Sequence, residues 1–166
     1  MPTGTAQRLQ REIHQTKPFQ SLGHETAIAL MLTADAVRRY ASRVLEPKGI
    51  TPQQFNVLRI LRGAGAEGLP TLAIAERMIE RTPGVTRLLD RMEEKGWVSR
   101  KRCPEDRRQV LCYATTAGLS LLRELDAPMS AADSEIVSGL TPRHCAQLLG
   151  ALESVREHLR SIEGKT

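Results

Sequence analysis

One stretch decides the fold, and from residue 71 to residue 114 it reads TLAIAERMIERTPGVTRLLDRMEEKGWVSRKRCPEDRRQVLCYA. Its first part predicts a short helix that begins at Thr71 and places three apolar residues on one face: Leu72, Ala75 and Met78. Thr82 and Pro83 then cap a second helix, whose apolar face consists of Val85, Leu88, Leu89 and Met92 and whose last turn precedes Gly96. Two short helices joined by the three-residue turn 79–81 predict a helix-turn-helix.

The hydrophobic period changes after Gly96, from that of a helix to that of strands. Residues 97–103 and 109–114 are rich in strand-favouring side chains, and the five residues between them, PEDRR, have the composition of a turn. This pattern predicts a basic β-hairpin, and a helix-turn-helix followed by such a hairpin is a winged helix. A five-residue tip places Cys103 opposite Gln109, so a disulfide between Cys103 and Cys112 is not expected.

Positive charge is concentrated in the same region. Residues 51–110 contain 12 Lys and Arg against 8 Asp and Glu, and nine of the 12 lie between Arg81 and Arg108. Residues 111–166 contain 5 Lys and Arg against 7 Asp and Glu. A negatively charged partner would therefore meet one short basic stretch, which favours nucleic acid. The alternative is that these charges only solvate helix faces.

The second helix of the motif has an outward face of small residues followed by arginines. We single out five positions at the start and along the outer face of this helix as DNA-binding: Thr82, Gly84, Thr86, Arg87 and Arg91. A helix start without bulky side chains approaches DNA closely, and its N–H groups and arginines can then contact phosphates and base edges. In the alternative reading the two arginines pair with Asp90, Glu93 or Glu94 along the helix.

The predicted wing carries the second group of DNA-binding candidates. A guanidinium from Arg108, held by Asp106, could enter the minor groove, and Arg107 competes for the same role. Lys101, like Arg100 and Arg102 beside it, lies on the strand that leads to the tip. These residues are expected either to contact DNA phosphates or to make no DNA contact. The alternative is a solvated turn in which Asp106 makes a local hydrogen bond.

Two long helices with coiled-coil-like seams flank this region. Apolar residues recur at spacings of three and four, as Leu30, Ala34, Val37, Ala41 and Val44 in residues 27–45, and as Cys145, Leu148, Leu152, Val155, Leu159 and Ile162 after a Thr141 and Pro142 cap. We expect the seams to pair with each other and with a second copy of the chain. Alternatively, they pack only against the middle of the same chain.

Two further helices complete the predicted elements. One begins at Thr51 and Pro52, and the other begins at Thr115 or Thr116 and is interrupted at Pro128. The predicted fold class is mainly α (α+β), a winged helix-turn-helix with long N- and C-terminal dimerisation helices. We assign residues 1–22 to a basic, flexible N-terminal arm, residues 49–115 to the winged helix-turn-helix DNA-binding region, and residues 23–48 and 116–163 to a helical dimerisation region.

Three segments in combination resemble the multiple antibiotic resistance regulator (MarR) family of bacterial transcription factors. They are LAIAERM (residues 72–78), TPGVTRLLDRMEEKGWV (82–98) and PEDRRQVL (104–111), and the likeness extends to GITPQQFNVL (49–58) and TTAG (115–118). The resemblance implies a homodimer that binds a palindromic duplex through two winged helices. It also implies that Thr86 and Arg87 lie on the recognition helix and that Asp106 and Arg108 are the D-x-R pair of the wing.

The resemblance implies a repressor that is released by a small aromatic or phenolic ligand, although it assigns no ligand-binding residues. Two other functions remain open from the residues: a winged-helix protein-interaction module, and a ligand-independent architectural DNA binder. The two adjacent arginines at the wing tip argue against the first.

Several classes of protein are not expected. The chain has no nucleophile with a positioned base, no phosphate-binding glycine loop and no metal-ligand spacing among His14, His24, His144 and His158, so we predict no enzyme, cofactor or metal site. It has no long apolar segment and no secretory signal, which predicts a cytoplasmic protein. An odd number of cysteines fits a reducing compartment, and Cys145 is expected to be a small buried hydrophobe.

Overall fold

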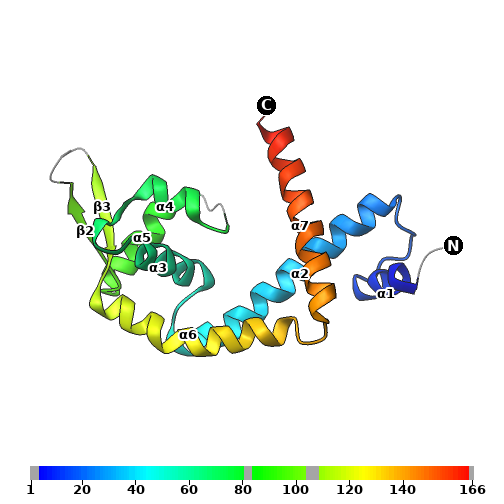
Figure 1. Cartoon of the computed structure of the whole chain (residues 1–166), viewed down its shortest axis with the longest axis horizontal. Coiled ribbons are helices and arrows are strands. Elements are labelled where there is room, and N and C mark those ends of the chain that lie inside the picture. Colours follow the sequence, from blue (N-terminus) through cyan, green and yellow to red (C-terminus); the bar gives the residue numbers. More distant parts are fainter. Residues whose placement is uncertain (1–3, 81–83, 104–108, 165–166) are drawn as a thin grey trace. The chain divides into compact units, whose positions relative to one another are not determined.

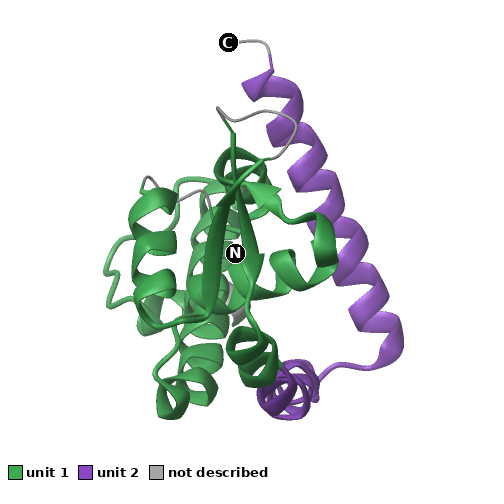
Figure 2. Ribbon diagram, turned by 90° about the vertical axis from the view of Figure 1, so that its left-hand side faces the viewer, with its two compact units in different colours: residues 1–122 green, residues 123–166 purple. Residues whose placement is uncertain are grey.

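The computed structural model describes residues 4–80, 84–103 and 109–164. It consists of two compact units, Met1–Leu122 and Arg123–Thr166, which Figure 2 shows in different colours. The elements in chain order (Figure 1) are α1 (Gly4–Glu12), α2 (Leu22–Leu45), η1 (Glu46–Lys48), α3 (Pro52–Ala64), η2 (Gly65–Glu67), β1 (Leu69–Pro70), α4 (Thr71–Arg77), α5 (Val85–Glu94), β2 (Val98–Arg102), β3 (Val110–Ala114), α6 (Thr116–Ile136) and α7 (Pro142–Glu163). The fold is therefore mainly helical with one small sheet, as predicted. Among the described residues, no helix is both long and apolar enough to cross a membrane.

The sheet is antiparallel, with the strand order β1-β3-β2. The hairpin has the predicted register: Arg102 pairs with Val110, and the backbone N–H of Cys103 donates to the carbonyl oxygen of Gln109 at 2.9 Å. Cys112 pairs with Arg100 across the strands, so the two cysteines are not opposite each other, and both are free thiols. The two-residue strand β1 was not predicted, because its residues Leu69 and Pro70 are too few to show a period.

The core of the first unit lies between its helices and this sheet. Helices α3 and α4 contact β3, and α5 contacts β2. The core side chains that are at most 2% exposed include Leu58, Leu61, Ile74, Leu89, Met92, Val98 and Cys112. The predicted apolar face of α4 is wrong at Leu72, which is 71% exposed, whereas Ile74 is fully buried. Ile74 and Met78, four positions apart, form the buried face of this short helix.

The helix starts follow the predicted caps in two places. Thr51 forms a capping box with Gln54 at the start of α3, and the hydroxyl of Thr141 accepts from the backbone N–H of His144 at 3.2 Å at the start of α7. Helix α5 begins at Val85, two residues later than predicted. Its N-cap is Gly84, whose φ of 103° lies in the left-handed region.

The predicted helix end at Pro128 is wrong. Helix α6 continues through this proline to Ile136. A proline removes one backbone donor, while the other residues of this 21-residue helix keep theirs.

The predicted N-terminal arm, residues 1–22, includes helix α1. Helix α2 begins at Leu22, where the hydroxyl of Ser21 accepts a hydrogen bond from the backbone N–H of His24.

Helix α7 has an exposed apolar face in the single chain. Four residues of the predicted seam are exposed by 39–47%, namely Leu148, Val155, Leu159 and Ile162, and two, Cys145 and Leu152, are half-buried. Cys145 is therefore less buried in the single chain than predicted. An apolar stripe of this length along a surface helix is typical of an interface.

Candidate nucleic-acid interface

Helix α5 divides its side chains between the core and the solvent. Val85, Leu88, Leu89 and Met92 are buried, as predicted. The candidate DNA-binding residues Gly84, Thr86, Arg87 and Arg91 are all exposed. The candidate Thr82 lies outside the described residues. The helix thus presents small residues and two arginines on one surface, with an apolar face that anchors it to the core.

Both ends of α5 are connected to neighbouring elements. At its C-terminal end the ammonium of Lys95 donates to the carbonyl oxygen of Gly49 at 2.7 Å and lies 4.4 Å from the ring centroid of Trp97. At its N-terminal end the guanidinium of Arg100 donates to the carbonyl oxygen of Thr86 at 3.2 Å. These contacts limit the freedom of the helix to move relative to the sheet and to the loop between η1 and α3.

Arg100 on β2 forms the main polar connection between the wing and α5. Its Nη1 lies 2.6 Å from Oδ1 of Asp90 and 3.5 Å from Oε2 of Glu93, and its backbone N–H donates to Oε1 of Glu93 at 3.0 Å. Burial is the largest single influence and disfavours the charged form, but the hydrogen bonds and charge interactions with Asp90 and Cys112 together outweigh it and raise the pKa of Arg100 above its ordinary value. Arg100 is therefore a structural residue, a role that the sequence pattern did not indicate.

This connection leaves the arginines of α5 facing solvent. Because Asp90 and Glu93 contact Arg100, they do not pair with Arg87 or Arg91, and no other carboxylate of the described residues does so. Arg91 instead donates from Nε to the carbonyl oxygen of Arg87 at 3.3 Å. The alternative reading, in which the two arginines are neutralised along their own helix, therefore does not describe this structure.

The described residues include both strands of the wing, β2 and β3. Lys101 is exposed, and its ammonium lies 5.7 Å from the ring centroid of Tyr113 on the neighbouring strand. Arg102 is also exposed. The three tip candidates Asp106, Arg107 and Arg108 lie outside the described residues.

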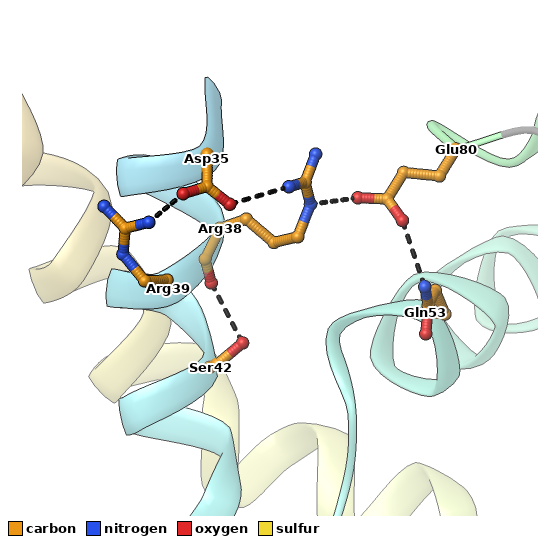
Figure 3. Close-up of polar contacts among 6 residues, drawn as sticks. All are labelled: Asp35, Arg38, Arg39, Ser42, Gln53 and Glu80. Atoms are coloured by element: carbon orange, nitrogen blue, oxygen red, sulfur yellow. Dashed lines mark hydrogen bonds and ion pairs between the residues drawn. The ribbon is translucent and has the colours of Figure 1, made fainter. Parts of the chain in front are cut away.

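The turn between α4 and α5 is held by side chains from two other helices. The backbone N–H of Ile79 donates to Oδ1 of Asn56 on α3 at 3.0 Å. The carboxylate of Glu80 accepts from Nε2 of Gln53 at 3.0 Å and from Nε of Arg38 on α2 at 2.5 Å, as Figure 3 shows. The hydrogen bonds from Arg38 and then from Gln53 lower the pKa of Glu80. Sequence reasoning missed this cluster because Arg38 and Glu80 are 42 positions apart.

A pocket of about 400 Å³ lies beside this cluster. Its lining comes from α2, α3 and the turn after α4, and it includes Val37, Pro52 and Ile79 together with the polar groups of Arg38, Asn56 and Glu80. Ile79, one of the lining residues, is 83% exposed. The pocket can hold a small, largely apolar molecule.

The environment of Cys112 disfavours an activated thiol. Cys112 is fully buried, and this burial raises its pKa, which disfavours the reactive thiolate. Within the described residues, no three His, Cys, Asp or Glu side chains are grouped as ligands for a metal ion.

Comparison with known proteins points to one family. Residues 50–110 match the model of the MarR family. The chain is 34% identical to a MarR transcription factor from Planctomyces limnophilus, with a TM-score of 0.62 over 84% of this chain and 98% of that one. It is 27% identical to a mutant MarR from E. coli solved in complex with operator DNA, with a TM-score of 0.73 over 82% and 99% of the two chains. A protein of Thauera aromatica described as a transcriptional regulator for the hcr operon is 25% identical over 71% of this chain and 70% of its own length.

Proposed function

Because this chain belongs to the MarR family of DNA-binding transcriptional regulators, we propose that it is a homodimeric repressor that binds a palindromic operator and is released by a small molecule. A repressor of this kind acts in the cytoplasm, where the DNA is. The observation that carries the proposal is the surface of α5, where Arg87 and Arg91 are exposed while their neighbouring carboxylates contact Arg100.

DNA recognition begins with α5 in the major groove. Thr86 and Arg87 in its first turns reach base edges, while Arg91 and Lys101 contact phosphates. Gly84 caps the start of the helix, and Thr82 comes two positions before it in the sequence; small side chains there permit close approach to the DNA backbone. The wing tip, with Asp106, Arg107 and Arg108, contacts the adjacent minor groove.

Dimerisation uses the terminal helices. The proposal is supported by the exposed apolar stripe on α7, whose side chains would be protected from water by a second copy of the chain. Residues 23–48 and 116–163 form the dimerisation region, and residues 49–115 form the DNA-binding region. Two copies related by a two-fold axis would present two α5 helices to the two halves of a palindrome.

The small-molecule effector would occupy the pocket beside Glu80. Its volume of about 400 Å³ suits a small aromatic or phenolic compound. The aliphatic side chains of Val37 and Ile79 offer contacts for a ring, and the amide of Asn56 offers a hydrogen bond for a hydroxyl group.

The proposal is tested by fluorescence anisotropy of the purified protein with labelled DNA from upstream of its own gene, with a shuffled duplex as control, across a salt series. Selective binding is expected, with log K falling linearly with log salt at a slope of about −0.9 per neutralised phosphate. Equal binding to both duplexes would overturn the sequence-specific repressor in favour of an architectural DNA binder. No binding at low salt would overturn DNA recognition and favour a protein-interaction module.

A further inference from the structure

A chain of polar contacts connects α2 directly to the turn that precedes the DNA-reading helix. Arg38 on α2 donates from Nε to Oε1 of Glu80 at 2.5 Å, and its Nη1 lies 3.3 Å from Oδ1 of Asp35 on the same helix. Asp35 also pairs with Arg39 (Figure 3). The guanidinium of Arg38 is therefore oriented by a contact within its own helix as well as by its contact with Glu80 in the turn.

The same turn is held on its other side by α3. Gln53 donates a hydrogen bond to the second carboxylate oxygen of Glu80, and Oδ1 of Asn56 accepts a hydrogen bond from the backbone N–H of Ile79. Gln53 and Asn56 are three positions apart and so lie on one face of α3. Both carboxylate oxygens of Glu80 are thus engaged, one by α2 and one by α3.

The Arg38–Glu80 ion pair, called the bridge below, matters more for DNA binding than for the stability of the fold. The side chains of Arg38 and Glu80 are 47% and 35% exposed, and exposed ion pairs contribute little to the stability of a fold. The core of the same unit rests on fully buried side chains such as Leu58 and Leu89. What the pair does constrain is the position of the turn, and hence the start of α5, relative to α2.

We propose that Arg38 and Glu80 are positioning residues for operator recognition, which hold the recognition helix at a fixed orientation to α2. The inference rests on the homodimer proposed above, in which α2 belongs to the dimerisation region. A dimer on a palindrome must place two recognition helices one turn of DNA apart, about 34–36 Å. Without the bridge, each DNA-binding region gains freedom relative to the dimerisation region, so binding to two half-sites at once is weakened.

The test compares three duplexes: a palindromic operator selected with the wild-type protein from random DNA, a single half-site, and the operator with one base pair inserted between its halves. Arg38→Ala and Glu80→Ala are each expected to raise the Kd for the operator about tenfold and the Kd for the half-site less than about twofold. The double variant is expected to be no weaker than either single variant, because both remove the same contact.

The inserted base pair provides a measurement that a loss of stability would not change. The wild-type protein is expected to bind the inserted operator much more weakly than the selected one. The two variants are expected to show a smaller ratio between these Kd values, since their DNA-binding regions adapt more easily to the altered spacing. Arg38→Lys, which keeps the positive charge, should restore a large part of the wild-type ratio.

Arg39→Ala is the matched control. It removes one positive charge from the same helix and the same partner, Asp35, but Arg39 does not contact Glu80 in the described structure. It should leave all three Kd values within about twofold of the wild type. Thermal unfolding of each variant establishes that it is folded, and Glu80→Gln replaces Glu80→Ala if the latter is not.

The outcomes separate this inference from the proposed function. If the wild-type protein selects no palindrome, the proposed function fails. If it selects one, but Arg38→Ala and the Glu80 variant retain the wild-type Kd and spacing ratio as Arg39→Ala does, the positioning role is wrong. A loss that is equal for operator and half-site would also overturn it, because it would indicate damage to α5 itself.

Discussion

Arg100 on β2 and Asp90 on α5 form an ion pair with 2.6 Å between Nη1 and Oδ1, which joins the wing to α5. The pair affects the charge of the surface that carries Arg87 and Arg91, because it engages a carboxylate that lies beside them on the helix. It also makes the orientation of α5 depend on the sheet.

Arg100→Ala should therefore weaken DNA binding without removing a DNA contact. It frees Asp90 and Glu93 to pair with Arg87 and Arg91 and leaves the carbonyl oxygen of Thr86 without its guanidinium donor. We expect a loss of stability of about 1 kcal/mol in urea unfolding and a roughly tenfold higher Kd for the operator. Arg102→Ala, an exposed arginine on the same strand, is the control for stability. Full operator affinity in Arg100→Ala would contradict this role.

Arg108→Ala tests the wing. If its guanidinium enters the minor groove, its removal should weaken operator binding by about 1 to 3 kcal/mol and reduce the salt slope, while the dimer stays intact. Anisotropy titration measures the affinity, and sedimentation verifies the dimer. An unchanged Kd would remove Arg108 from the recognition surface.

Leu152→Asp tests the seam on α7. A charge in the middle of an apolar interface without a partner is unfavourable, so we expect a monomer in analytical ultracentrifugation. Ser154→Asp adds the same charge on the same helix at a position away from the seam, and it should remain dimeric. A dimer that persists in Leu152→Asp would show that this seam is not the interface.

Gly118→Ala tests the packing of α6 against the hairpin. A Cβ atom at Gly118 would lie 2.4 Å from the carbonyl oxygen of Trp97, in a place where Thr115 already bonds to Gly96 and to Gly118. We expect a loss of about 1 to 3 kcal/mol in the free energy of unfolding. Gly150→Ala on α7, where nothing lies within 4 Å of the added atom, should be neutral or stabilising. Equal effects of the two changes would contradict the close approach.

The Arg38–Glu80 bridge should depend on pH. Because its hydrogen bonds lower the pKa of Glu80 from 4.5, the stabilisation is complete above that pH and is lost as the pH falls through the lower folded value. The difference in unfolding free energy between wild type and Glu80→Gln, below about 1 kcal/mol at neutral pH, should shrink on acidification. In an Arg38→Ala background the neutral-pH difference should be largely absent. A difference that is independent of pH would argue against the ion pair.

The features that were predicted correctly are those whose sequence signals come from residues close together in the chain. The helix start at Thr51, the cap at Thr141 and the hairpin register at Cys103 and Gln109 all depend on residues that are near each other in the chain. The buried face of α5 was also predicted, because its four apolar residues repeat with the helical period over ten residues.

The features that were missed depend on tertiary contacts. Helix α4 is seven residues long, which is too short for periodicity to distinguish the exposed Leu72 from the buried Ile74. The role of Arg100 arises from a register that brings β2 against α5, and that of Glu80 from the packing of α2 and α3 beside the turn. Neither contact leaves a signal in the neighbouring sequence.

The most direct test of the central claim is a paired binding measurement with the wild-type protein and Arg87→Ala, on the selected operator and on its shuffled duplex. We predict that the wild type prefers the operator strongly and that Arg87→Ala loses about 1 to 3 kcal/mol on the operator and little on the shuffled duplex, with the dimer intact. Equal wild-type affinity for the two duplexes, or an Arg87→Ala variant with full operator preference, would contradict the assignment of α5 as the helix that reads the DNA.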